Sequence, residues 1–372
     1  MINVQEIVHG FKTPESRWAR FGLYYAMFPV DFAFDVVGHY SKQNDYIIDP
    51  FAGRCSSVFA GGVLRRHSLG IEINPVGWLY GYVKLDPANK FMVVNRILEI
   101  YRQRNYYSKT VERMPLFYRM CYCDEVLKFL LAARKHLKWD SNTTDATLMS
   151  ILLVYLHGKL GEGLSNQLRM TKAMGINYSI KWWKSKKLTT PPEINPKDFV
   201  IKRLNCRYKK GKPKVFDSSV ILGDSTIEID RIIQRAQKTD IRFSLLFTSP
   251  PYYSITDYFT DQWLRHWMLG GPDLPKSRQE IYKGRFVSKD EYYNLLDTVF
   301  GKCAELMDKK STVYVRTDSR EFTFNSTLEI LQKHFPNHKT KVIDRPFKRK
   351  TQTEILGNSS SASGEVDIIM TR

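Results

Sequence analysis

The chain has 372 residues, a formal net charge of +19, 43% hydrophobic residues and 26% charged residues. This length excludes a minimal module and favours either one large domain with an insertion or two domains. The ordinary charged fraction excludes a disordered basic tail. The excess of Lys and Arg favours a polyanionic partner such as nucleic acid, with ribosomal or membrane-surface association as the alternative.

Cysteine usage and the apolar runs indicate a cytoplasmic protein. The five cysteines are scattered and odd in number, so we expect no disulfide framework. Cys121 and Cys123 form a close pair, but no second pair or His cluster accompanies them, and we predict no bound metal. The apolar run 148–156 is too short to span a bilayer, and the first residues lack the basic-then-apolar pattern of a secretion signal.

The first two predicted strands flank a helix. Residues 46–53 predict a buried strand that runs into a glycine-containing turn, and residues 67–75 predict a second strand that ends near Glu72. In such a β-α-β unit, ligands bind beyond the carboxyl ends of the strands. The turn lets a ligand approach the backbone, and the acidic side chain can accept both hydroxyls of a ribose. The unit therefore predicts an adenosine site, although each feature is also common elsewhere.

The middle of the chain differs in character, because long amphipathic stretches such as 91–104 and 124–137 replace the short apolar runs. We predict a mostly helical insertion there, with a role in target recognition. It divides the chain into the parts 1–75, 76–213 and 214–372.

A basic segment with interleaved aromatic side chains lies late in the insertion. Its centre is Lys181, Trp182 and Trp183. Such a segment is typical of surfaces that hold phosphates and stack on bases. For the two tryptophans, packing within the insertion is the alternative.

The alternation of strands and helices resumes after the insertion. A helix is predicted over 289–306, and strands are predicted over 218–224, 242–247, 311–316, 339–343 and 365–370. Asp224, at the end of the first of these strands, can accept a hydrogen bond from an adenine amino group or cap the next helix.

Between the last two strands, the sequence predicts a long, mobile, basic loop. Lys348, Arg349 and Lys350 lie in it, followed by a Ser-rich run. We expect these three side chains to contact phosphates, with a merely solvated loop as the alternative.

The stretch Thr248, Ser249, Pro250, Pro251, Tyr252 and Tyr253 directly follows a predicted strand. The two prolines have fixed φ and no N–H group, which makes the turn stiff. The hydroxyl before them and the aromatic ring after them can accept hydrogen bonds from an exocyclic amine and stack on its ring. A Pro-rich exit from a strand with a buried Tyr is the alternative.

Taken in order, these motifs resemble those of S-adenosylmethionine-dependent DNA amino-methyltransferases. The motifs are Asp49 to Gly53, Glu72 with Pro75, Gly223 to Ser225, and Thr248 to Tyr252. Residues 17–21, 24–29 and 257–267 are similar to one bacterial and phage branch of that family. The resemblance implies an α/β, Rossmann-like class I methyltransferase fold with a mostly parallel seven-stranded sheet and a helical insertion between its second and third strands.

The resemblance also implies roles for individual residues. Ser249 and the Pro250 carbonyl would bind the target amine, with Pro251 in the same turn and the Tyr252 ring stacked on a flipped base beside Tyr253. The residues that would hold S-adenosylmethionine are Phe28, Asp49, Pro50, Phe51, Ala52, Gly53, Glu72, Asp224 and Thr248. Cys55 departs from the family, which usually has a second Gly there, and we expect its side chain to crowd the cofactor turn.

The predicted reaction is methylation of the exocyclic N4 amine of cytosine in double-stranded DNA. Ser at the first position of the four-residue motif is associated in the family chiefly with cytosine N4, and adenine N6 is the alternative. Carbon-5 methylation requires a thiolate, typically in a Pro-Cys context, and no Pro-Cys dipeptide occurs here. Two alternatives belong to other functional classes. One is an RNA or protein amine methyltransferase, and the other is an inactive DNA-binding module. A restriction or defence protein is a candidate partner.

Overall fold

The computed structural model describes residues 4–24, 27–170, 174–254, 258–275, 288–345 and 364–372. Its centre is a seven-stranded sheet in the order β3-β2-β1-β4-β5-β7-β6. Each strand lies where the sequence predicts one. The strands are β1 (Tyr46–Asp49), β2 (His67–Glu72), β3 (Ser218–Leu222), β4 (Phe243–Thr248), β5 (Met307–Asp318), β6 (Lys339–Arg345) and β7 (Glu365–Thr371).

Strand direction decides the fold class. The pairs from β3 to β5 are parallel, whereas β7 runs antiparallel to both of its neighbours, β5 and β6. The order reverses between β1 and β4, which is the kind of position where open α/β sheets bind ligands. This arrangement confirms the predicted α/β class I methyltransferase fold.

The central strands bring two distant motifs together. Ile47 and Ile48 of β1 pair with Leu245 and Leu246 of β4, and all four are buried because helices cover both faces of the sheet. Parallel neighbours end at the same edge, so the turn after β1 and the loop after β4 lie side by side.

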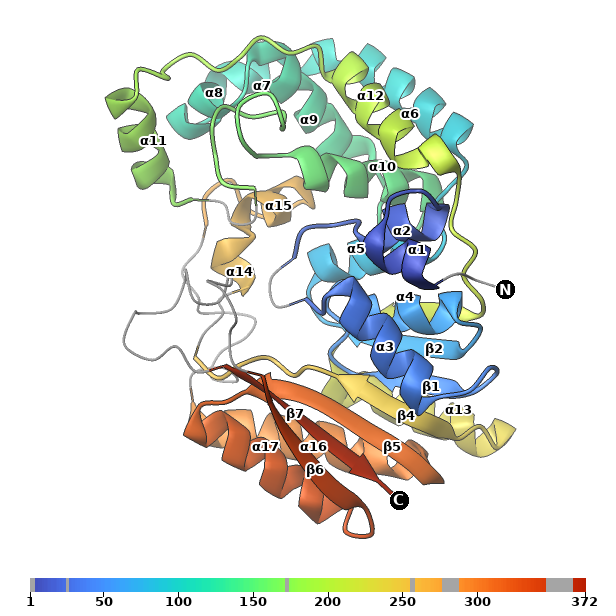
Figure 1. Cartoon of the computed structure of the whole chain (residues 1–372). Helices are drawn as coiled ribbons and strands as arrows, with labels where there is room; N and C mark the ends of the chain where they lie inside the picture. The colour runs from blue at the N-terminus through green and yellow to red at the C-terminus, as the bar shows by residue number, and fades with distance from the viewer. Residues whose placement is uncertain (1–3, 25–26, 171–173, 255–257, 276–287, 346–363) are drawn as a thin grey trace.

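Helices form a layer on each face of the sheet (Figure 1). One layer contains α3 (Val30–Tyr40), α4 (Ser56–Val63) and α5 (Pro75–Leu85), and the other contains α13 (Ser225–Thr239), α16 (Lys289–Leu306) and α17 (Glu321–His334). Each layer packs its apolar side chains into its own core, for example Phe59 and Leu79 in the first and Ile229 and Val299 in the second. The helix predicted over 289–306 is confirmed as α16.

The insertion forms a helical body above the sheet in Figure 1. It contains α6 (Lys90–Gln103), η1 (Arg104–Tyr107), α7 (Ser108–Arg113), α8 (Leu116–Cys121), α9 (Asp124–His136), α10 (Thr143–Tyr155), α11 (Ile176–Ser185), α12 (Pro196–Arg207) and η2 (Tyr208–Lys210). The amphipathic stretches predicted to be helical are confirmed as α6 and α9. Helix α5, which the predicted boundary assigns to the insertion, instead packs on β3, where Trp78 Nε1 donates to the Val220 carbonyl over 3.1 Å.

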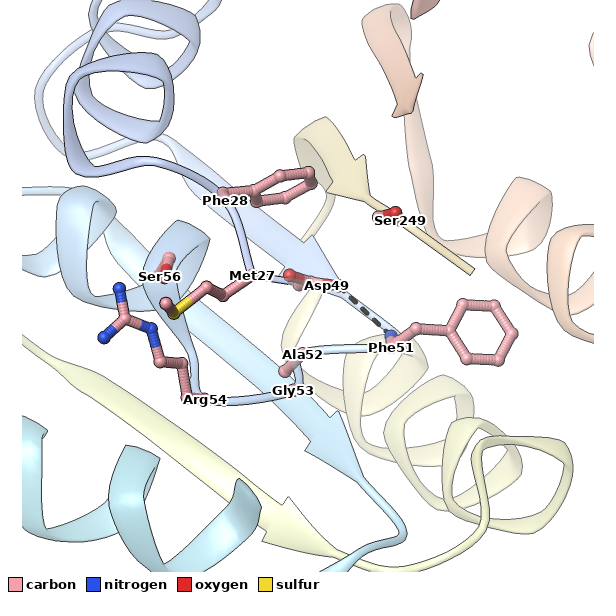
Figure 2. Close-up of a pocket in the computed structure, with 9 residues that line it drawn as sticks. All are labelled: Met27, Phe28, Asp49, Phe51, Ala52, Gly53, Arg54, Ser56 and Ser249. Carbon is pink, nitrogen blue, oxygen red and sulfur yellow. Dashed lines mark hydrogen bonds between the residues drawn. The ribbon is translucent and has the colours of Figure 1, made fainter. Parts of the chain in front are cut away.

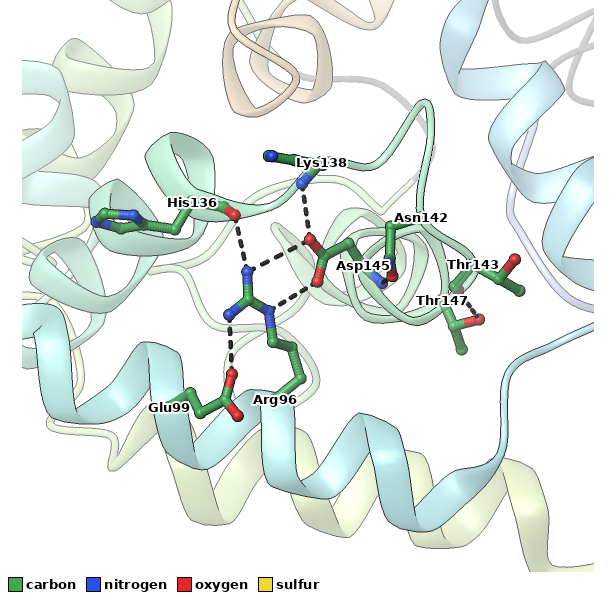
Figure 3. Close-up of polar contacts among 8 residues, drawn as sticks. All are labelled: Arg96, Glu99, His136, Lys138, Asn142, Thr143, Asp145 and Thr147. Carbon is green, nitrogen blue, oxygen red and sulfur yellow. Dashed lines mark hydrogen bonds and ion pairs between the residues drawn. The ribbon is translucent and has the colours of Figure 1, made fainter.

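A buried ion pair fixes the helices of the insertion to one another (Figure 3). Arg96 of α6 donates from Nε to Asp145 Oδ1 of α10 over 2.7 Å and from Nη2 to the His136 carbonyl of α9 over 2.8 Å. Asp145 also accepts from the Lys138 backbone N–H over 2.8 Å. Asp145 is buried and Arg96 is partly exposed, and their contacts link α6, α9 and α10.

Side-chain contacts also join the insertion to the sheet-forming part of the chain, in addition to the two connections that enter and leave it. The short helices α14 (Tyr258–Asp261) and α15 (Trp263–Met268) follow the loop after β4. Arg265 of α15 is completely buried and donates to the Leu153 and Met170 carbonyls over 3.0 and 2.8 Å. Trp267 packs on Tyr118 of α8 with ring centroids 4.7 Å apart. The insertion therefore anchors the chain that leaves the β4 loop.

Two short helices, α1 (Val4–His9) and α2 (Pro14–Ala19), precede the sheet. Trp18 of α2 donates from Nε1 to the Gly211 carbonyl over 3.1 Å, at the end of the insertion.

Within the ranges that the structure describes, no helix combines the length and the apolar character needed to cross a membrane.

Candidate active site

The turn after β1 brings its backbone close to the end of β2. The Ala52 N–H donates to the Ile71 carbonyl over 2.9 Å, and the Gly53 N–H donates to Glu72 Oε2 over 2.6 Å. Gly53 has φ of +54°, a left-handed conformation that residues with a Cβ rarely adopt. The shape of the turn therefore favours glycine at this position.

Glu72 holds the turn as a buried acceptor. Its second oxygen accepts from the Asn74 N–H over 2.8 Å, and the residue is 8% exposed. Burial raises the pKa of Glu72 to about 8, against the opposing effect of its hydrogen bonds to Asn74 and Gly53. Glu72 also has a side-chain hydrogen bond with Tyr24. A carboxylate has about four acceptor positions, so these three bonds leave room for about one ligand hydroxyl.

Asp49 links the turn to the loop after β4. Its Oδ1 accepts from Thr248 Oγ1 over 2.6 Å and from the Phe51 N–H over 3.1 Å, and its Oδ2 accepts from the Ser57 hydroxyl. Burial raises the pKa of Asp49 to about 6, although hydrogen bonds from Ser57, Thr248 and Phe51 act in the opposite direction. The two predicted motifs are thus joined by a direct hydrogen bond.

A small pocket lies between the turn and the β4 loop. In Figure 2, Phe28 and Ser249 lie on one side of Asp49, and Ala52 and Gly53 lie on the other. Phe28 is fixed by stacking on Phe247 of β4, with centroids 4.6 Å apart and planes 5° apart. The lining residues are Met27, Phe28, Asp49, Phe51, Ala52, Gly53, Arg54, Ser56 and Ser249.

The predicted cofactor residues divide into two groups. Those that line the pocket are Phe28, Asp49, Phe51, Ala52 and Gly53. The Phe51 ring points away from the other labelled side chains in Figure 2 and packs near Phe300 of α16, so this residue offers its backbone to the pocket.

The remaining predicted cofactor residues are Pro50, Glu72, Asp224 and Thr248, and they lie outside the lining. Thr248 is completely buried, and its hydroxyl donates a hydrogen bond to Asp49. The Pro50 carbonyl accepts a hydrogen bond from the Ser225 hydroxyl. Asp224 caps α13 and accepts from the Thr226 N–H over 3.0 Å, which is the alternative role that the sequence left open.

The loop after β4 presents Ser249 to the pocket, while Pro250 is buried and Pro251 is partly exposed. Tyr252 is 5% exposed, and its hydroxyl donates to Glu365 Oε1 of β7 over 3.0 Å. The predicted stacking role of Tyr252 therefore requires its covered ring to become accessible. Tyr253 turns toward the opposite layer and packs edge-on against Phe322, with centroids 4.9 Å apart.

The Cys55 side chain does not line the pocket. The residue adopts φ of 58° and is completely buried, and it is not part of the pocket lining. A Cβ added to Gly81 of α5 would lie 2.2 Å from Cys55 Sγ. The absent side chain of Gly81 therefore provides the room that Cys55 fills, on the α5 side of the turn.

The predicted nucleic-acid contacts on the insertion are only partly exposed. Lys181 is exposed on α11 and Trp182 is partly exposed. Trp183 is completely buried, and its Nε1 donates to the Gln167 carbonyl over 2.7 Å. Trp183 thus belongs to the core of the insertion, which corrects its assignment as a contact residue. Lys348, Arg349 and Lys350 lie outside the described residues.

Sequence reasoning missed several residues at or near the pocket, including the lining residues Met27 and Ser56. Arg54 lines it and donates to the Gly22 carbonyl over 2.9 Å, while the buried Lys84 donates to the Arg54 carbonyl over 2.6 Å. Burial lowers the pKa of Lys84 well below its ordinary value. Arg54 directly follows Gly53 of the predicted cofactor motif, so its position could have been used to predict it. Nothing local in the sequence points to Lys84 or Glu365. Among the described residues, no cluster of three His, Cys, Asp or Glu side chains could hold a metal ion.

No family model and no curated protein matches the chain. Solved structures that match include an rRNA methyltransferase from Streptomyces viridochromogenes, with 9% identity, a TM-score of 0.33 and coverage of 100% of this chain and 90% of that chain. Another is a SAM-dependent methyltransferase from Agrobacterium tumefaciens, with 8% identity, a TM-score of 0.35 and coverage of 93% of this chain and 63% of that chain. The fold assignment rests on the strand order and the antiparallel β7, and not on these neighbours.

Proposed function

We propose that this chain transfers a methyl group from S-adenosylmethionine to the exocyclic N4 amine of cytosine in double-stranded DNA. One observation carries the proposal. Thr248, at the start of the amine-binding motif, donates to Asp49, at the start of the cofactor turn, and Ser249 and Asp49 line the same pocket. A methyl donor on the turn and an amine on the loop would therefore be neighbours.

The residues of the turn suit this cofactor. The backbone of Ala52 and Gly53 borders the pocket without a bulky side chain, and Asp49 and Glu72 supply buried carboxyl groups whose partners are neutral. Such groups attract a cationic ligand because the ionised carboxylate is poorly stabilised without it. Asp49 would face the methionine part, Glu72 the ribose and Asp224 the adenine. When bound, the cofactor supplies an electrophilic methyl group on a sulfonium.

Ser249 and Pro250 would act on the amine. The lone pair of a cytosine amine is delocalised into the ring, which makes the amine a weak nucleophile. Acceptors at the Ser249 hydroxyl and the Pro250 carbonyl would draw its two hydrogens out of the ring plane and localise the lone pair. Because no covalent intermediate is needed, positioning would supply most of the acceleration, on the order of 7–11 kcal/mol in favourable cases.

A base in a duplex must leave the stack to reach Ser249, which costs a few kcal/mol. The exposed lysines of α11 and the turn that follows it would help to offset this cost through phosphate contacts. They are Lys181, Lys184, Lys186 and Lys187, and no acidic residue lies between them. Figure 1 shows α11 on the side of the insertion from which α14 and α15 connect to the β4 loop.

The alternatives make different products. Adenine N6 methylation would use the same acceptors, and an RNA or protein substrate would keep the cofactor site and change the partner surface. An inactive DNA-binding module is disfavoured, because the Cys55 side chain that motivated it lies against Gly81.

Transfer of tritium from methyl-labelled S-adenosylmethionine to duplex DNA, RNA or protein tests the proposal. We expect label in duplex DNA, and we expect Ser249→Ala to reduce it by roughly 100-fold, the usual effect of removing one preorganised polar group. Label confined to RNA or to protein would contradict the DNA assignment.

A further inference from the structure

Glu365 makes a contact with the β4 loop that the proposed chemistry has not used. It is the first residue of β7, and its Oε1 accepts from the Tyr252 hydroxyl over 3.0 Å. The two residues are 113 positions apart in the sequence. Tyr252 is the ring on which the proposed target base would stack, so this bond acts directly on the acceptor side of the site.

The Glu365 carboxylate is itself held in place. Arg316 of β5 approaches it with 3.6 Å between Nη1 and Oε2. Arg316 is fixed from the other side by Asp367, with 2.6 Å between Nε and Oδ1. Asp367 is completely buried and also accepts from Tyr314 and Arg345, over 2.7 and 2.8 Å. Glu365 is therefore the outer, partly exposed member of a charged cluster that joins β5, β6 and β7.

The same cluster reaches the wall of the pocket. The guanidinium of Arg316 lies over the Phe32 ring, 3.5 Å from its centroid. Phe32 packs edge-on against Phe28, which lines the pocket, with centroids 5.2 Å apart. Contacts thus run without interruption from Phe28 through Arg316 and Glu365 to Tyr252.

We propose that Glu365 is a positioning residue for methyl transfer, which fixes the Tyr252 ring, and through it the target base, relative to the methyl donor. This inference rests on the proposed function. A tyrosine ring turns about two bonds, and a hydroxyl anchored to a rigid carboxylate removes that freedom. Misplacing a reacting group by about 1 Å can cost on the order of 100-fold in rate.

The Tyr252 hydroxyl acts here as a donor and not as a base. Burial and the neighbouring Glu365 charge raise the pKa of Tyr252 well above its ordinary value, while a hydrogen bond with Ser249 opposes this. The phenol therefore keeps its proton, and the bond to Glu365 persists at neutral pH. Removal of either partner should consequently break this bond, and loss of the Tyr252 hydroxyl also removes its hydrogen bond with Ser249.

A double-mutant cycle with single-turnover kinetics at saturating cofactor tests the role of the bond to Glu365. We expect Glu365→Ala and Tyr252→Phe each to slow transfer by roughly 10- to 100-fold with little change in cofactor affinity. The double variant should be no slower than Tyr252→Phe alone, because that variant already lacks the bond to Glu365, together with the bond to Ser249. Glu365→Gln, whose amide oxygen can still accept the bond, should retain most of the rate.

The chain offers a matched control. Tyr293 of α16 donates to Glu329 of α17 over 2.8 Å, a Tyr–Glu bond of the same kind far from the loop in sequence and exposed to solvent. Glu329→Ala should leave the transfer rate unchanged. Additive effects of Glu365→Ala and Tyr252→Phe, or an unchanged rate in Glu365→Ala, would overturn the inference.

Hydrogen exchange separates this inference from the proposed function. Amide exchange of residues 248–254, measured by mass spectrometry, requires no turnover. Glu365→Ala should accelerate it and Glu329→Ala should not. If the wild-type protein transfers no methyl group to any nucleic acid or protein, the proposed function fails, yet faster exchange still supports the anchoring of Tyr252. Unchanged exchange in Glu365→Ala overturns the anchoring whatever the activity.

Discussion

Two groups of buried carboxyl groups are stabilised in opposite ways. At the cofactor turn, Asp49 and Glu72 bond to neutral hydroxyl and amide groups, and burial raises their pKa values to about 6 and about 8. At Asp367, burial also raises the pKa, but hydrogen bonds and charge from Arg316, with Tyr314 and Arg345, outweigh it and lower the pKa.

The difference separates a structural group from a binding group. The charge of Asp367 is neutralised within the protein, so the β5–β7 cluster is complete as it stands. Within the part of the chain that the structure describes, Asp49 and Glu72 have no cationic partner, so burial favours their neutral forms and a cationic ligand would stabilise their ionised forms. Sites that hold ligands commonly show such perturbed groups.

The largest expected effect comes from breaking the neutralised cluster. Arg316→Met should lower the free energy of unfolding by about 3 kcal/mol, because it removes a main cationic partner of a completely buried carboxylate. Urea denaturation measures the change. Arg231→Met is the control, since the Arg231 side chain is 71% exposed in its ion pair with Glu228 and such pairs contribute about 0–1 kcal/mol. Equal decreases in the two variants would contradict the distinction.

At the cofactor turn, the free energy of unfolding should instead depend on pH. The pKa of Glu72 is about 8 when folded, against an ordinary value of 4.5, so between these pH values the folded protein binds a proton that the unfolded chain has released. The free energy of unfolding should therefore fall as pH rises from about 5 to 8, by up to about 1.4 kcal/mol per pH unit for this proton.

Glu72→Gln isolates this contribution, because its side chain does not ionise. The variant should show a smaller slope of stability against pH in urea denaturation at pH 6, 7 and 8. It should also lack the increase of cofactor affinity with pH that calorimetry should detect in the wild type. Identical slopes for variant and wild type would mean that Glu72 does not titrate in this range.

Sequence patterns predicted the sheet and the edge of the site because both depend on local signals. Apolar runs indicated β1 and β4, and a glycine turn and a Pro-Pro turn follow them. The features that these patterns missed depend on contacts between distant residues. The Glu365 anchor for Tyr252 joins positions 113 residues apart, and Gly81 makes room for Cys55 from another helix. Trp183 was misplaced because a basic neighbourhood says nothing about which helix face is buried.

A smaller effect is expected on the partner surface. Lys181→Ala with Lys184→Ala should weaken binding to duplex DNA and reduce the log-log salt slope by about 0.9 for each phosphate that these lysines neutralise. The control is Lys309→Ala with Lys310→Ala, two exposed lysines in the amino-terminal part of β5, away from the carboxyl edge. Binding isotherms at several salt concentrations provide the slopes. Equal slope changes in the two double variants would mean that DNA binds a diffuse basic surface and not a defined site on α11.

The smallest effect is expected at Cys55. Cys55→Gly relieves a left-handed conformation, which costs about 1–2 kcal/mol for most residues, but it also empties a buried space beside Gly81. Because the thiol does not line the pocket, cofactor affinity in calorimetry should stay within about twofold of the wild type. A large gain in affinity would mean that Cys55 does restrict the turn.

The cofactor turn and the β4 loop are proposed to form one site for methylating a base amine. Mass spectrometry of nucleosides from duplex DNA incubated with the protein and S-adenosylmethionine is the sharpest test of that site. We expect N4-methylcytosine with the wild type and roughly 100-fold less of it with Ser249→Ala. N6-methyladenine would keep the mechanism and change the base, whereas 5-methylcytosine, or no methylated base while RNA or protein is methylated, would contradict the proposal.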